Sequence, residues 1–205
     1  MRSAVAATLA LLFVATSCAT PGDGGAGGLR AADYVDARVG ARFTYRVTPG
    51  PEAPQTVTIT HRDDRGFYVD DAGGRIAPRS DGVFDGSRFL IKDPVVDGST
   101  WTAVAPGPRP GMPGITETYT VRAVRAAATV PAGTFDDCVV VEGTTPTRDP
   151  NDGRAAVLIM TWTWARGVGL VKLTQAVRYV GDDTTHQTAS MELVARATAE
   201  SAAAP

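Results

Sequence analysis

The chain has 205 residues, of which 43% are hydrophobic, 20% charged and 7% aromatic. This composition is typical of one globular domain with extra loops, and it excludes a disordered or fibrous chain. The formal net charge of -2 provides no basic field to attract phosphate backbones, so we expect no nucleic-acid partner.

The first 17 residues have the pattern of an export signal. Arg2 supplies a positive charge, and residues 4–16 form an apolar run that ends in small side chains. A membrane span needs about 20 apolar residues, so this shorter run is typical of a signal peptide that is cleaved after secretion. Residues 11–18 read Leu-Leu-Phe-Val-Ala-Thr-Ser-Cys, which resembles the lipobox of a bacterial lipoprotein signal.

The lipobox resemblance implies that Cys18 is the lipid attachment site and the first residue of the mature protein. Two or more attached acyl chains anchor a protein stably, so the predicted partner is a membrane. Ala19 lacks the Asp that marks inner-membrane retention in enteric-type sorting. We therefore expect a cell-envelope protein, at the outer membrane facing the periplasm. The alternative is an ordinary secretory signal in which Cys18 has no role.

A tether, a domain and a tail are expected after the signal. Residues 18–28 combine the cysteine with a Gly-rich stretch that behaves as a flexible tether. The folded domain is expected over residues 29–197, and the Ala-rich segment 198–205 is expected to be a disordered tail. If Cys18 carries lipid, Cys138 has no disulfide partner, and its strand-like surroundings predict a small buried hydrophobe.

Residues 29–197 predict an all-β fold with a single antiparallel β domain. Short β-branched and aromatic runs recur between Gly, Pro, Asp and Asn clusters, and only residues 29–39 leave room for a short helix. The Pro- and Gly-rich residues 105–114 must form a surface loop. An open curved sheet, a sandwich and a partly closed barrel all remain possible. The expected strands are residues 43–47, 56–61, 66–69, 89–92, 116–124, 138–141, 156–164, 170–179 and 187–195.

Three stretches of the domain are similar to marks of the TapB-like group, exported β-rich domains of unknown function in bacterial lipoproteins. They are residues 34–45, 130–138 and 164–172. In the second, Pro131 and Gly133 force a tight connection, and in the third, glycines allow a hairpin or bulge. The resemblance implies an antiparallel β fold and an envelope location, with no activity to carry over.

The sequence offers no catalytic constellation. Catalysis by serine needs a base, and the chain has only His61 and His186, which we expect at a strand rim and in a solvated turn. Two histidines and one available cysteine supply no zinc motif, and Asp pairs in turns are typical of hairpin connections. We expect no enzyme activity, no metal and no cofactor.

The strand around residues 156–164 provides the one candidate for a binding face. Leu158, Met160, Trp162 and Trp164 share one parity, so their side chains lie on the same side of the strand. The simpler interpretation is a central strand covered on both faces. The functional interpretation is the lining of a site for an apolar ligand such as an acyl chain.

Two function hypotheses follow. The first is a non-enzymatic structural or assembly role among envelope proteins. The alternative is a carrier or binding protein for a lipid or other hydrophobic ligand, and a hydrolase with residues that cannot be named is a weaker third.

Overall fold

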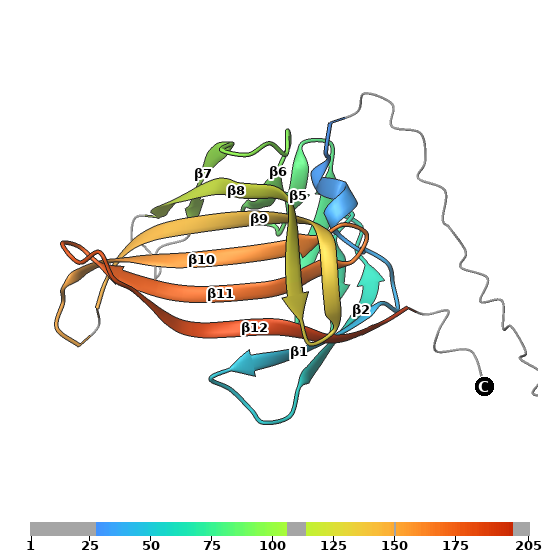
Figure 1. Ribbon diagram of the computed structural model, residues 1–205. Helices are drawn as coiled ribbons and strands as arrows, with labels where there is room; N and C mark the ends of the chain where they lie inside the picture. The colour runs from blue at the N-terminus through green and yellow to red at the C-terminus, as the bar shows by residue number, and fades with distance from the viewer. Residues whose placement is uncertain (1–27, 106–113, 150, 199–205) are drawn as a thin grey trace, which may run out of the picture.

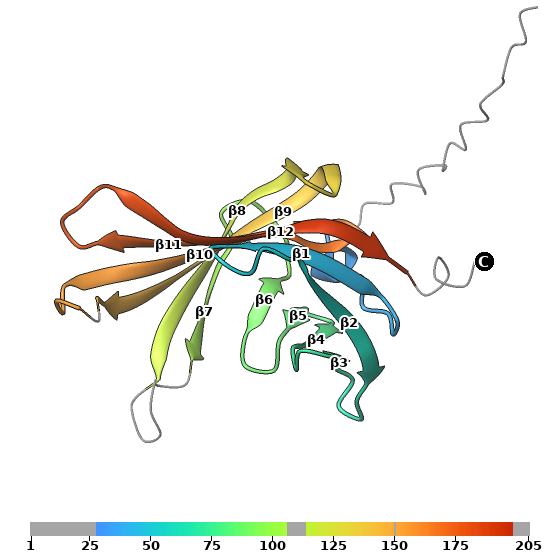
Figure 2. The same ribbon diagram turned by 90° about the horizontal axis from the view of Figure 1, so that it is seen from below.

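The structure, a computed structural model, describes residues 28–105, 114–149 and 151–198. All twelve strands belong to one antiparallel sheet in the order β6-β5-β4-β3-β2-β1-β12-β11-β10-β9-β8-β7. The sheet curls until its two edges approach each other, which makes a nearly closed barrel (Figure 2). The predicted all-β class with a single antiparallel domain is therefore confirmed, and the partly closed barrel is the arrangement observed.

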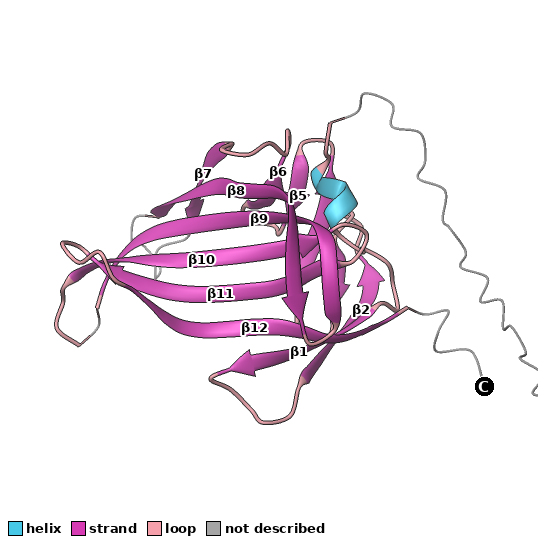
Figure 3. Ribbon diagram, viewed as in Figure 1, coloured by secondary structure: helices cyan, strands magenta, loops and turns pink. Residues whose placement is uncertain are grey.

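One short 3₁₀ helix, η1 (Ala31–Tyr34), precedes the strands and is the only helix in the described ranges (Figure 3). It falls inside the segment where the sequence leaves room for a helix. No helix in the described part of the chain is long and apolar enough to cross a bilayer. The strands are β1 (Arg42–Thr48), β2 (Gln55–Arg62), β3 (Tyr68–Asp70), β4 (Arg75–Arg79), β5 (Gly82–Phe84), β6 (Phe89–Lys92), β7 (Thr100–Ala105), β8 (Ile115–Val130), β9 (Gly133–Arg148), β10 (Ala155–Ala165), β11 (Gly169–Tyr179) and β12 (Thr185–Ala197).

The chain order of the strands brings the two halves of the sequence together. Strands β8 to β12 form long consecutive hairpins that lie side by side in Figure 1, and β1 then pairs along β12 from Arg42 opposite Ala197 to Thr48 opposite Ser190. Strands β2 to β6 continue from β1 as short hairpins. The pairing of β1 with β12 therefore sets the N-terminal hairpins opposite the long C-terminal strands.

Side chains connect the two edges of the sheet, β6 and β7. The indole Nε1 of Trp101 on β7 donates to the carbonyl oxygen of Phe89 on β6 at 3.0 Å. Arg88, which precedes β6, lies 2.6 Å from the buried carboxylate of Glu117 on β8, and the Tyr119 hydroxyl donates to the same carboxylate at 2.5 Å. Because neither edge pairs with the other through a backbone ladder, these side-chain bonds hold the barrel closed.

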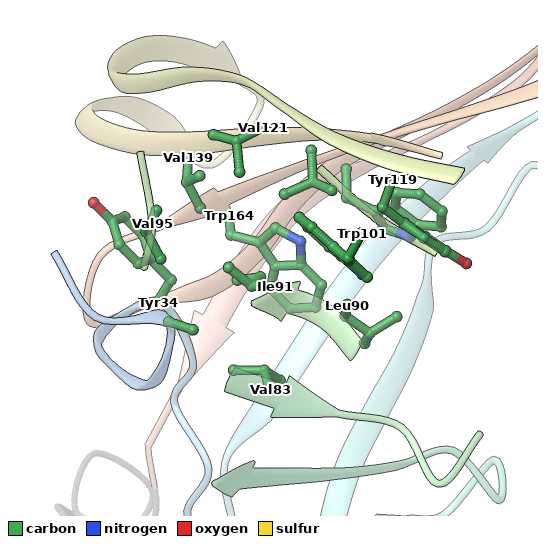
Figure 4. Packing of buried hydrophobic residues seen from close by; sticks show 13 residues of the cluster. Tyr34, Val83, Leu90, Ile91, Val95, Trp101, Tyr119, Val121, Val139 and Trp164 are labelled. Carbon is green, nitrogen blue, oxygen red and sulfur yellow. The ribbon is translucent and has the colours of Figure 1, made fainter. Parts of the chain in front are cut away.

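The interior contains two clusters of buried apolar side chains. The first lies between the closing strands, where the side chains of Tyr34, Ile91, Trp101, Tyr119 and Trp164 gather (Figure 4). The Trp101 and Tyr119 rings stack with centroids 5.4 Å apart. The second cluster contains Phe43, Tyr45, Ile59, Val130, Cys138, Val171 and Leu193, among others.

The β8–β9 hairpin folds back over β12 to cover the second cluster. Its turn consists of Pro131 and Ala132, and Gly133, the first residue of β9, has a φ of 133°, as the tight connection predicted there requires. The backbone N–H of Ala132 donates to the carbonyl oxygen of Leu193 at 3.0 Å, which fixes the hairpin tip on β12. Cys138, on β9, is fully buried in the second cluster, as predicted. Burial first, and then the charges of the two neighbouring aspartates, raise the pKa of its thiol to about 11.

Candidate functional site

An apolar cavity of about 250 Å³ lies where the N-terminal hairpins face the long C-terminal strands. It is larger than the roughly 150 Å³ cavity that is known to hold benzene, and slightly below the range of about 300–1,000 Å³ for drug-sized ligands. The cavity therefore has room for a small apolar molecule or for part of a larger one. Its apolar lining consists of Val35, Phe43, Tyr45, Val57, Ile59, Tyr68, Ile76, Trp164, Leu170 and Met191.

Strand alternation explains four of these ten apolar residues. Phe43 and Tyr45 on β1 and Val57 and Ile59 on β2 occupy alternate positions, so their side chains share the concave face. Phe43 pairs with Val57 in the register of the two strands, which sets the two inward residues side by side. An alternating sequence in two paired strands thus produces one continuous apolar wall.

A bulge in the β10–β11 pair forms the opposite wall. Thr163 pairs with Lys172 but Trp164 pairs with Leu170, so one extra residue on β11 is left unpaired and both Trp164 and Leu170 line the cavity. Gly169, at the start of β11, has a φ of 115° that a residue with a side chain rarely adopts. Gly167 and Gly169 therefore belong to the β10–β11 hairpin, which is one of the two arrangements, a hairpin or a bulge, that the sequence allows there.

Trp164 is the lining residue with an unsatisfied polar atom. Its exposed fraction is 5%, and its indole Nε1 has no hydrogen-bond partner in the protein. By contrast, the hydroxyl of the lining residue Tyr45 donates to the Leu170 carbonyl oxygen at 3.0 Å. A buried donor without an acceptor costs about 1–3 kcal/mol, so the unpaired indole of Trp164 is a local cost within the apolar core.

Asp36 is a charged lining residue whose bonds are already made within the protein. Its carboxylate accepts from Arg38 Nε at 2.5 Å and from Arg196 Nη2 at 2.8 Å. Burial on its own raises the pKa of Asp36, but the hydrogen bond from Arg38 and the charge of Arg196 hold it below the ordinary value of 3.8. Asp36 is therefore ionised at neutral pH, and the charges of Arg38 and Arg196 balance its negative charge.

The other two charged lining residues lie nearer solvent. Asp70 Oδ1 accepts from the backbone N–H groups of Ala72 at 3.0 Å and Gly74 at 2.7 Å, which closes the β3–β4 turn. Arg75 is exposed, and its guanidinium lies 5.9 Å from the centre of the Phe67 ring. The exposure of Arg75 marks the place where the cavity meets solvent.

The structure spreads the four predicted β10 face residues along the strand instead of gathering them at one site. Trp164 lines the cavity, whereas Trp162 packs in the core with its ring centre 5.9 Å from that of Tyr119. Met160 packs against the same core cluster, and Leu158 lines a second, more polar depression at the far end of the strands. The face is thus mostly core, and one of its members belongs to the candidate site.

The second depression, of about 660 Å³, lies between the tips of two hairpins. Its walls are already bonded to one another. The Tyr179 hydroxyl donates to Asp149 at 2.5 Å, and the guanidinium of Arg154 lies 4.0 Å from the centre of the Tyr179 ring. Because that ring face is covered and the surrounding charges are exposed, this depression has less of the character of an apolar binding site than the cavity does.

The two histidines occupy exposed positions. His61, on β2, has its Nδ1 3.0 Å from the Thr60 hydroxyl, and His186, at the start of β12, has its Nε2 3.8 Å from an Asp182 carboxylate oxygen. Within residues 28–105, 114–149 and 151–198, no three His, Cys, Asp or Glu side chains gather in a way that could hold a metal ion. Cys18, the predicted lipid attachment site, lies outside the described residues, as do the rest of the signal and nearly all of the tether.

Comparison with known proteins adds a likeness of fold. No family model and no curated protein matches the sequence, so the resemblance to the TapB-like group stays a prediction. A "putative lipoprotein" from Parabacteroides distasonis is 13% identical with a TM-score of 0.42, and the match covers 80% of this chain and 98% of that chain. A "putative exported protein with YmcC-like fold" from Bacteroides fragilis is 12% identical with a TM-score of 0.40, covering 78% and 97%.

Proposed function

We propose that the protein is a non-catalytic binding protein for a hydrophobic ligand, held at the cell envelope by lipid attached to Cys18. The cavity between β1–β4 and β10–β12 is the observation that supports binding, since ten of its lining side chains are apolar. Transfer of apolar groups from water into such a site is favourable by about 0.8 kcal/mol for each CH₂ buried. The ligand is a lipid portion or another apolar molecule of matching size.

The envelope location follows from the lipobox resemblance and the Gly-rich tether. Cys18 would carry the acyl chains, and residues 19–28 would hold the domain away from the bilayer. A binding domain placed in this way, at the outer membrane facing the periplasm, can exchange hydrophobic molecules with the membrane or with other envelope proteins.

A structural or assembly role among envelope proteins is the competing proposal. The large apolar side chains that are exposed in the described ranges are four valines from four separate segments: Val39, Val96, Val104 and Val180. Single exposed apolar residues of this kind are normal on any protein surface. The apolar cavity, which opens to solvent near Arg75, therefore favours ligand binding over a partner-binding surface.

Binding to the cavity can be tested with a filled-cavity variant. The full chain carrying Cys18→Ser, which leaves no attached lipid to compete, is titrated with n-butylbenzene by isothermal titration calorimetry. Val57→Phe places a ring in the space that the ligand needs. We expect this variant to weaken binding by at least about tenfold, because overpacking costs about 1–3 kcal/mol.

Val104→Phe is the matched control, because Val104 on β7 is 66% exposed and does not line the cavity. We expect this variant to bind n-butylbenzene as the unsubstituted chain does. Absence of measurable binding to the chain with Val57 intact, or equal affinities for the Val57→Phe and Val104→Phe variants, would refute the proposal.

A further inference from the structure

We infer that the ligand of the cavity is a lipophilic amine, an apolar body that ends in an ammonium group, and that the Asp70 carboxylate at the cavity mouth binds this group. The inference rests on the proposed function and narrows its ligand from any hydrophobic molecule to a cationic amphiphile. The apolar body fills the cavity, and the ammonium group stays at the solvent side, where it keeps part of its hydration.

The position of Asp70 in the sheet turns its side chain toward the cavity. Asp70 on β3 pairs with Ile59 on β2, and residues directly opposite each other in paired strands share a face of the sheet. Ile59 is a buried lining residue, and Tyr68, two residues before Asp70 on the same strand, also lines the cavity. Asp70 is half-buried and belongs to the lining beside them.

The Asp70 carboxylate has one oxygen bonded within the fold and one that is available. Oδ1 accepts from the backbone N–H groups of Ala72 and Gly74, whereas Oδ2 accepts no hydrogen bond in the part of the chain that the structure describes. No basic side chain of the described ranges forms an ion pair with Asp70. Burial first, and then the charge of Asp70, raise the pKa of the lining residue Tyr45 above 10.0, so this charge acts inside the cavity.

The other carboxylate of the lining, that of Asp36, does not need a ligand cation. Arg38 and Arg196 are both bonded to it, and neither arginine lines the cavity. Asp70 is therefore the lining carboxylate whose charge has no partner among the described residues, and a ligand ammonium group supplies that partner.

The arginines near the mouth offer an anionic head group less than Asp70 offers a cation. Arg75 pairs with Val69, so its side chain leaves β4 on the face that Asp70 does not share, and its guanidinium lies 5.9 Å from the centre of the Phe67 ring. Arg62 lies 5.4 Å from the centre of the Tyr68 ring and does not line the cavity. The charge at the mouth therefore selects a cation over an anion.

The inference is tested with three probes that share one apolar body: n-butylbenzene, 4-phenylbutylamine and 4-phenylbutanoate. Each is titrated by isothermal titration calorimetry at pH 7 into the full chain with Cys18→Ser. At this pH the second probe is a cation and the third an anion. We expect 4-phenylbutylamine to bind about tenfold more tightly than 4-phenylbutanoate, because a partly exposed carboxylate attracts the first and repels the second.

Asp70→Asn removes the charge but keeps an Oδ1 that accepts from Ala72 and Gly74, so the β3–β4 turn is retained. We expect the ratio of the two affinities to fall from about tenfold to about one. A change in cavity shape alone would weaken both probes alike and leave this ratio as it was. Asp71→Asn is the matched control, because Asp71 is exposed, does not line the cavity and likewise accepts a backbone N–H, that of Thr58 at 2.9 Å. In this variant the ratio should stay near tenfold, and thermal unfolding checks that both variants fold.

Failure of this inference is distinguishable from failure of the proposed function. If n-butylbenzene and 4-phenylbutylamine both fail to bind, the proposed function is wrong and the inference falls with it. If n-butylbenzene binds but 4-phenylbutanoate binds as tightly as 4-phenylbutylamine or more tightly, the inference alone is wrong. Equal ratios in the Asp70→Asn and Asp71→Asn variants would also overturn it, since the preference would then come from the overall charge of the protein surface.

Discussion

The side chain of Asp36 connects two parts of the domain that are far apart in the sequence. Its carboxylate is 5% exposed and accepts bonds from Arg38 on one side and Arg196 of β12 on the other. Through Arg196 it ties the segment after η1 to the last strand, 160 residues away in the chain. One wall of the cavity is therefore fixed by an ion pair between the two ends of the domain.

We predict that Asp36→Asn lowers the free energy of unfolding by about 1–3 kcal/mol at pH 7, because Arg196, which is 25% exposed, loses its charged partner. The folded-state pKa of Asp36 lies below 3.8, so its contribution is present above that pH and is lost as the pH falls through the lower, folded-state value. The difference between the two proteins should therefore shrink at pH 3. Urea unfolding followed by tryptophan fluorescence at pH 7 and pH 3 measures both differences.

Asp152→Asn is the control for the Asp36 prediction. Asp152 lies 2.6 Å from Arg154, but both side chains are largely exposed, so solvent screens the pair and its removal should change stability little. A difference between the Asp36→Asn and unsubstituted chains that stayed the same from pH 7 to pH 3 would contradict the assigned ion pair.

At the scale of strands, β9 shows how tightly the elements pack around the aromatic core. Gly143 pairs with Met160 on β10 and with Tyr119 on β8. A Cβ atom at Gly143 would lie 2.8 Å from the Trp162 ring and 3.0 Å from the Tyr119 ring. Glycine at this position lets the two rings lie directly against the strand.

Gly143→Ala should therefore destabilise the fold by about 1–3 kcal/mol, because the added methyl group forces two packed rings to shift. Gly28→Ala is the matched control, since a Cβ there meets nothing within 4 Å. Thermal and urea unfolding of both variants tests the prediction. Equal stability of the two variants would contradict the prediction, since the rings around Gly143 would then accommodate the added methyl group with no loss in the free energy of unfolding.

The strands that the sequence predicts best are those with a regular pattern and a buried face. Alternation predicts β1 and β2 to within one residue at each end, and the apolar runs predict β10 and β11 equally closely. Strands β4, β5 and β7 are not predicted. Pro78 interrupts the pattern of β4, β5 has only three residues, and β7 is an edge strand with one buried residue.

Strands β8 and β9 are longer than their patterns indicate. Each has 16 residues, because their outer parts form a hairpin that extends past the main sheet and curls over β12. The outer part of β8 is rich in alanine and alternates weakly, so its sequence does not mark it as a strand. Its covering role depends on contacts with Leu193, which lies far along the chain.

The cavity illustrates a limit of sequence reasoning at the same scale. Trp164 is predicted as a candidate site residue because it belongs to an apolar stripe on one strand. Phe43 and Ile59 lie in the expected strands 43–47 and 56–61, where apolar and polar residues alternate, but nothing local shows that these two side chains face Trp164. That arrangement depends on the pairing of β1 with β12 and on the β10–β11 bulge, both of which are set by long-range packing.

For the molecule as a whole, the curling of the sheet that brings its edges together also creates the cavity. The bonds from Trp101 to Phe89 and from Arg88 to Glu117 close the barrel on one side. The first apolar cluster fills the space behind this closure, and the cavity is left between that cluster and the second one. A curled sheet with two separate cores thus encloses a space that neither core fills.

Methyl NMR provides the most direct test of the central claim that this space binds a hydrophobic ligand. On addition of n-butylbenzene to the full chain with Cys18→Ser, the methyl signals of Ile59, Ile76, Leu170 and Met191, all of which line the cavity, should shift through the ring current of the bound probe. The signals of Val104 and Val180, which are exposed elsewhere, should stay in place. Shifts confined to the exposed valines, or no shifts at saturating probe, would contradict the account.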